Sequence, residues 1–190
     1  MQLKSKVARI VLIGVCLLLT QCKAQVDTQS SNELAPFFGT YTGTSINVVK
    51  GEVSERDLAV TIKPWDKNGF NLEWTAVTYR ANGKQKKAQT SINFYRSPRD
   101  GIFASAMKKD VFGNTVPYDP VGVDAAPYVW AGLEGKTLTV RALYIVDSGA
   151  YEIHTYKRTL QEEGLALDFD RVRNGERVTQ VLAMLTPTKP

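Results

Sequence analysis

The chain has 190 residues, with 24 lysines and arginines against 19 aspartates and glutamates, and its two cysteines, Cys16 and Cys22, both lie near the N-terminus. Four basic residues and no acidic residue precede Gln25, so the remainder has a net charge of only +1. A nearly neutral, cysteine-free remainder excludes a disulfide framework and a thiolate nucleophile or metal site, and it does not imply the strongly basic face of a nucleic-acid-binding protein.

Residues 1–24 have the layout of a signal peptide. Lys4, Lys6 and Arg9 precede an apolar stretch at residues 10–19, which then gives way to polar residues. A membrane-spanning helix needs about 20 apolar residues, and this stretch has roughly half that number. A cleavable signal is therefore favoured over an uncleaved anchor, and we expect the protein to reach the periplasm or the outer membrane.

Two cleavage sites compete at the end of this segment. Residues 19–22 (LTQC) resemble a bacterial lipobox, which would place a lipid anchor on Cys22, although the residue before the cysteine is bulkier than usual. Residues 22–24 (CKA) instead offer small residues to an ordinary signal peptidase, and Gln25 would then come first. Both remain open, with a slight preference for the lipoprotein because residues 25–36 predict a polar, solvated tether.

Residues 37–190 predict one all-β domain, because short alternating runs are separated by Gly, Asn, Asp and Pro. Asn-Gly pairs at 68–69, 82–83 and 174–175 are typical of tight hairpins, since these residues tolerate positive φ. Most connections then join sequence neighbours, which favours a single antiparallel up-and-down β-barrel of about ten strands. We expect strands near residues 38–49, 57–63, 69–80, 87–96, 101–107, 128–133, 136–146, 150–160, 164–173 and 177–186.

Alternation along these runs predicts which side chains face the interior. Each run is apolar on one face and mostly polar on the other, so it needs a second sheet or closure into a barrel to cover it. Closure also removes exposed strand edges. The irregular stretch from Lys108 to Pro127 is either a lid at a barrel mouth or a surface loop. The expected interior includes Trp74, Phe94, Val140, Tyr144 and Phe169.

Residues 34–43 (LAPFFGTYTG) resemble the first strand of calycin-type barrels, the lipocalin, fatty-acid-binding and nitrobindin-like families. Those families open with a Gly-x-Trp element whose ring closes one end of the barrel, and here Tyr41 takes the place of the tryptophan. Residues 92–96, 164–167 and 178–183 are similar to the nitrobindin-like pattern. The resemblance implies a lipocalin-like barrel that follows the signal segment.

Two positions depart from the pattern of these families. In the haem-binding members a histidine on the final strand ligates iron, and Val181 stands there in this chain, so we expect neither haem nor another cofactor. Tyr41 also has the opposite strand parity to Ile46 and Val48, so a bulge near Gly43 is needed if all three are to face inward.

Candidate catalytic groups are few. His154, the only histidine, shares a strand face with Glu152 and Tyr156 and could take part in proton transfer if that face lined a cavity, but a solvent-facing position is favoured. Asp168 and Asp170 are more typical of a charged exterior. Without a positioned nucleophile, a phosphate-binding loop or a zinc-ligand cluster, we expect no catalytic residue, no metal site and no enzymatic activity.

Arginines continue the interior face at the strand ends. If the strands alternate in direction, Arg80 and Arg171 approach one rim and Arg96 the other, so the first two could hold an acidic head group, with rim solvation as the alternative. We expect an exported barrel that binds a small, mostly apolar or amphipathic molecule and contacts a membrane only through a lipid anchor. The alternative is an envelope protein-interaction or scaffolding lipoprotein without a ligand cavity. The predicted ligand-binding residues are Trp74, Arg80, Phe94, Tyr144, Phe169 and Arg171.

Overall fold

The computed structural model describes residues 33–49, 52–80, 82–123 and 126–188. The predicted signal segment, lipidation at Cys22 and the tether up to residue 32 lie outside the described residues. The description begins with a short 3-10 helix, η1 (Ala35–Phe37), directly before the first strand.

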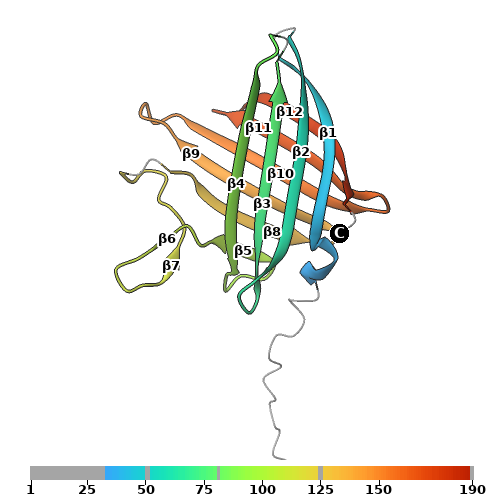
Figure 1. The fold of residues 1–190 in the computed structure, drawn as a ribbon. Coiled ribbons are helices and arrows are strands. Elements are labelled where there is room, and N and C mark those ends of the chain that lie inside the picture. The colour runs from blue at the N-terminus through green and yellow to red at the C-terminus, as the bar shows by residue number, and fades with distance from the viewer. Residues whose placement is uncertain (1–32, 50–51, 81, 124–125, 189–190) are drawn as a thin grey trace, which may run out of the picture.

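Ten antiparallel strands close into one barrel, in the order β1-β12-β11-β10-β9-β8-β5-β4-β3-β2 (Figure 1). Almost every strand pairs with its neighbour in sequence, and β1 meets β12 to close the ring. The predicted up-and-down antiparallel barrel of about ten strands is therefore confirmed. The barrel strands are β1 (Gly39–Val49), β2 (Glu52–Trp65), β3 (Gly69–Tyr79), β4 (Gln85–Arg96), β5 (Ile102–Ser105), β8 (Tyr128–Glu134), β9 (Thr137–Ile145), β10 (Tyr151–Gln161), β11 (Gly164–Arg173) and β12 (Glu176–Pro187).

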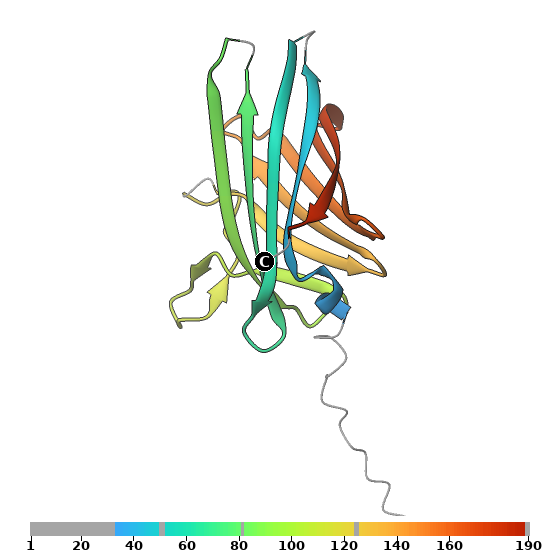
Figure 2. The same ribbon diagram turned by 45° about the vertical axis from the view of Figure 1, so that its right-hand side comes forward.

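The long segment between β5 and β8 contains a small hairpin that the sequence did not predict. Its strands, β6 (Lys108–Lys109) and β7 (Thr115–Val116), are two residues each and form a separate sheet. Both views place this hairpin on the flank of the barrel beside β5, away from the end where β1–β2 and β3–β4 turn (Figures 1 and 2). The hairpin is thus a surface element and does not lie over that end as a lid.

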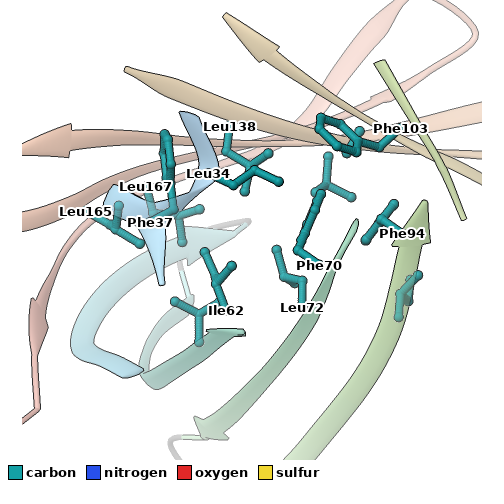
Figure 3. Close-up of a cluster of buried hydrophobic side chains, with 14 of the residues drawn as sticks. Leu34, Phe37, Ile62, Phe70, Leu72, Phe94, Phe103, Leu138, Leu165 and Leu167 are labelled. Atoms are coloured by element: carbon teal, nitrogen blue, oxygen red, sulfur yellow. The ribbon is translucent and has the colours of Figure 1, made fainter. Parts of the chain in front are cut away.

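One end of the barrel, the closed end, is filled by apolar side chains. Phe70 stacks on Phe94 with ring centroids 4.8 Å apart and meets Phe103 edge-on at 5.3 Å (Figure 3). Leu34 and Phe37 of the η1 segment are also fully buried there, and Tyr41 donates a hydrogen bond to the Phe37 carbonyl oxygen at 3.2 Å. Tyr41 and η1 therefore close this end, where the resemblance placed the aromatic plug.

The bulge near Gly43 that a shared inward face would require is absent between β1 and β2. β1 pairs with β2 without a break, from Gly39 opposite Ile62 to Val49 opposite Glu52. Tyr41 faces inward, whereas Ile46 is 73% exposed, so the two residues lie on opposite faces and no bulge is needed. A Cβ at Gly43 would collide with the Met184 backbone oxygen of β12, so this glycine permits close strand approach at the seam of the barrel.

Candidate functional site

The opposite half of the barrel, toward the β1–β2, β3–β4, β9–β10 and β11–β12 turns, has a polar interior, and we call it the polar half. Strand β10 supplies much of it. His154 pairs with Ala142 and Tyr156 pairs with Val140, and both partners belong to the buried interior face. The predicted solvent-facing position of His154 is therefore wrong. Strand β10 carries polar side chains on its inner face as well as its outer face, so polarity did not distinguish the two.

Glu152 organises a charged cluster in this half, although its side chain is only 8% exposed. Arg171 binds it with two hydrogen bonds, Nε to Oε1 at 2.7 Å and Nη2 to Oε2 at 2.8 Å. Arg173 Nε donates to Oε2 at 3.1 Å, and His154 Nε2 lies 2.6 Å from Oε1. The strands β10 and β11 create this cluster by pairing residues of the same inward parity.

The hydrogen bonds from Arg171 foremost, and that of His154 as well, outweigh burial and lower the pKa of Glu152 to about 2. A carboxylate held this acidic is a weak base. The pair formed by His154 and Glu152 therefore suits charge neutralisation inside the barrel better than proton transfer.

Aromatic side chains line the rest of the polar half. Trp74 of β3 lies across the interior from Tyr156 of β10, with ring centroids 5.5 Å apart, and Tyr156 lies 4.6 Å from Phe169 of β11. Tyr144 of β9 continues the lining, with its ring 4.7 Å from His154. These four aromatic residues are all partly exposed although they point inward, whereas the phenylalanines of the closed end are fully buried.

Four described side chains of inward parity have buried donor atoms without a partner: Ser45, Arg56, Arg158 and, beside Phe103 at the closed end, Arg96 through its Nη1 atom. Arg158 is only 3% exposed, and its Nε and Nη1 make no hydrogen bond. Nε of Arg56 and Oγ of Ser45 also make no hydrogen bond. Arg56 on β2 and Ser45 on β1 are directly paired across the two strands. Arg158 Cζ lies 5.4 Å from the Tyr156 ring centroid, and burial lowers its pKa to about 10.

The structure brings four of the six predicted ligand-binding residues into one region. The polar half is lined by Trp74, Tyr144, Phe169 and Arg171. The guanidinium of Arg171 is already paired with the Glu152 carboxylate. Phe94 belongs to the packed core of the closed end, and Arg80 is exposed just beyond the end of β3.

Sequence reasoning missed Ser45, Arg56, Glu152 and Arg158 as interior groups. Strand parity contained the signal for all four, since Ser45 has the parity of Tyr41 and Glu152 has the parity of Tyr156. Arg56 has the parity of the interior residue Val60, and Arg158 has the parity of Tyr156.

The outer wall also has concave surfaces. A groove of about 640 Å³ is lined by residues that include Ile102, Tyr128, Trp130 and Leu143. Within the described parts of the chain, no three His, Cys, Asp or Glu side chains are grouped so that they could hold a metal ion. None of the helices described there is long and apolar enough to span a membrane.

Comparisons with known proteins give a likeness at the level of structure. No protein-family model matches the chain, and no curated protein matches it in sequence. Among solved structures, the S-type phycobiliprotein lyase CPES from Guillardia theta is similar, with 9% sequence identity, a TM-score of 0.35, and coverage of 86% of this chain and 95% of the lyase. The closed meander barrel itself agrees with the calycin-like layout that the opening strand implies.

Proposed function

We propose that this protein is an exported barrel that binds a small, largely apolar molecule inside its polar half. The observation that carries this proposal is the partial exposure of inward-pointing aromatic rings. Trp74, Tyr144, Tyr156 and Phe169 face the interior yet are not fully covered by other side chains. Apolar walls with a few polar groups are the usual composition of small-molecule sites.

The proposal is tested with the uncharged fluorescent probe N-phenylnaphthylamine. We expect saturable binding that Phe169→Ala weakens by about tenfold, because losing a buried aromatic contact costs roughly 1.5 kcal/mol or more. The control is Tyr128→Ala, which removes an aromatic ring from the outer groove. Absence of saturable binding, or equal weakening by the two variants, would overturn an interior site.

Export forms the second part of the proposal and rests on the layout of residues 1–24. Radiolabelled palmitate should enter the parent protein and not Cys22→Ser if the protein is lipid-anchored. An N-terminus at Gln25 after export would instead identify a soluble periplasmic form. Retention of residues 1–24 in the mature protein would contradict both forms.

A protein-interaction role is the second candidate, and exposed apolar side chains between β5 and β8 favour it. Val111, Phe112, Val121 and Val123 are 76% to 103% exposed. A photo-crosslinker at Phe112 that captures one defined envelope protein, together with failure of the barrel to bind the fluorescent probe, would support this role over ligand binding.

A further inference from the structure

We propose that Arg158, Arg56 and Ser45 form an anion-binding subsite inside the barrel, which holds the acidic group of an amphipathic ligand such as a carboxylate. This inference rests on the proposed function, because it names the chemical class of the molecule bound at the same interior site. We call these three residues the arginine site.

The interior has more positive than negative charge. Among the described side chains, Arg56, Arg158 and Arg171 share the inward strand parity, and Glu152 is the acidic side chain that faces them. The neighbouring acidic groups point outward and have partners there: Asp57 accepts from the Tyr79 hydroxyl, Asp168 from Gln180 and Asp170 from Arg177.

The available negative charge is used by a different arginine. Glu152 takes both of its bidentate hydrogen bonds from Arg171, which leaves no described carboxylate for Arg158 or Arg56. Removing a charged group from water without a partner is costly. The cation–π contact with Tyr156 offsets part of that cost for Arg158, but it does not satisfy the unpaired N–H donors.

Two observations place these donors on the interior face: Arg158 Cζ lies 5.4 Å from the Tyr156 ring centroid, and Arg56 and Ser45 are paired across β2 and β1. Burial, and then the neighbouring Tyr144, raise the pKa of Tyr156 to about 12, while the positive charges of Arg158, Arg171 and Arg56 act in the opposite direction. The positive charges carried by β10, β11 and β2 would therefore also favour an anion beside Tyr156. An anion beside this hydroxyl would accept hydrogen bonds from Arg158 and Arg56 and would neutralise part of their charge.

This placement differs from the rim site that the sequence suggested. Arg80 is exposed to solvent, where an ion pair contributes little, and Arg171 is neutralised by Glu152. Arg158 is buried and has free donors, so an anion that reaches it gains a charge-assisted contact in a water-poor environment. The acidic group of the ligand is thus expected deep in the barrel, with its apolar part against the aromatic lining.

Two fluorescent probes that share one aromatic skeleton test the proposal. Anilinonaphthalene sulfonate carries an anionic group that N-phenylnaphthylamine lacks. We expect Arg158→Gln to lower the affinity for the sulfonate by about tenfold to a hundredfold, because one charge-assisted contact is lost. The affinity for the neutral probe should change by less than about twofold. Arg56→Gln is a second variant with the same expected pattern, and Arg80→Gln at the rim is the control, with both affinities unchanged.

The outcomes separate this inference from the proposed function. If neither probe binds the parent protein, the proposed function itself fails. If the neutral probe binds but Arg158→Gln and Arg56→Gln weaken the sulfonate no more than the neutral probe, only the arginine site is overturned. If only Arg80→Gln lowers the affinity for the sulfonate, the acidic group binds at the rim and the arginine site is overturned.

Stability without ligand gives an independent measurement. Replacing an unpaired buried charge with an apolar side chain of similar length removes an unfavourable burial, so Arg158→Met should raise the urea midpoint of the ligand-free protein. The same variant should lose the thermal stabilisation that anilinonaphthalene sulfonate gives the parent protein. A lower urea midpoint in Arg158→Met would show that the guanidinium is already paired in the folded protein, and would contradict an anion site there.

Discussion

The closed end and the polar half are built on the same strands but differ in what the inward positions carry. Along β3, Phe70 and Leu72 are completely buried, whereas Trp74 two residues further is partly exposed. Along β10, Leu160 packs on the core and the positions before it are Arg158, Tyr156 and His154. Packing at one end therefore stabilises the barrel, which allows the other end to retain polar groups that are costly to bury.

Phe70→Ala should produce the largest loss of stability, because it removes a fully buried ring that contacts Phe94 and Phe103. The expected loss is about 3 to 5 kcal/mol in the free energy of unfolding. Urea denaturation followed by circular dichroism measures it. A loss below about 1 kcal/mol would mean that the closed end is not the stabilising half.

Glu152→Gln should cost about 2 to 3 kcal/mol, because it removes charge-assisted hydrogen bonds from Arg171, Arg173 and His154. The folded-state pKa lies near 2, below the ordinary value of 4.5, so the ionised carboxylate contributes its full stability above about pH 4.5. That contribution is lost as the pH falls from 4.5 toward 2.

Urea midpoints measured across this acid range should therefore fall more steeply for the parent protein than for Glu152→Gln. The isosteric amide has no proton to gain, which makes it the matched control for acid unfolding. Parallel pH profiles would show that Glu152 is not held ionised by its arginine partners.

Trp74→Ala should cost about 2 kcal/mol, less than Phe70→Ala, because the indole is only partly buried and packs on the core from one side. The comparison of the two variants in the same urea titration measures the difference between the halves directly. A cost equal to that of Phe70→Ala would mean that the polar half is as tightly packed as the closed end.

Ile46→Thr should have the smallest effect, within about 0.5 kcal/mol of the parent protein, because an outward side chain that is 73% exposed contributes little packing. The neighbouring Ser45 faces inward and is buried. A large loss in the urea midpoint of Ile46→Thr would indicate that Ile46 packs inside the barrel, which would require a bulge near Gly43.

The architecture was predictable because it depends on local signals. Alternating apolar residues and Asn-Gly turns located ten strands and their order, and Asn174 and Gly175 do adopt positive φ, at 48° and 87°. The β6–β7 hairpin was missed because two-residue strands carry no periodic pattern.

The polar half was harder to predict because its inward positions break the rule that buried faces are apolar. Glu152, His154 and Arg158 have the interior parity of β10, but their polarity is typical of an exposed face. Only the pairing of β10 with β9 and β11 shows where they point. Sites built from buried charge depend on tertiary closure, which local sequence patterns do not encode.

The most direct test of a ligand site inside the polar half uses the three tryptophans as internal reporters. Trp74 faces the interior of the polar half, Trp130 lines the outer groove, and Trp65 ends β2 near the closed end. In an NMR titration of the nitrogen-15-labelled protein with N-phenylnaphthylamine, we predict that the indole resonance of Trp74 shifts with saturation while those of Trp65 and Trp130 stay unchanged. A shift confined to Trp130, or no indole shift at saturating probe, would contradict a ligand site inside the barrel.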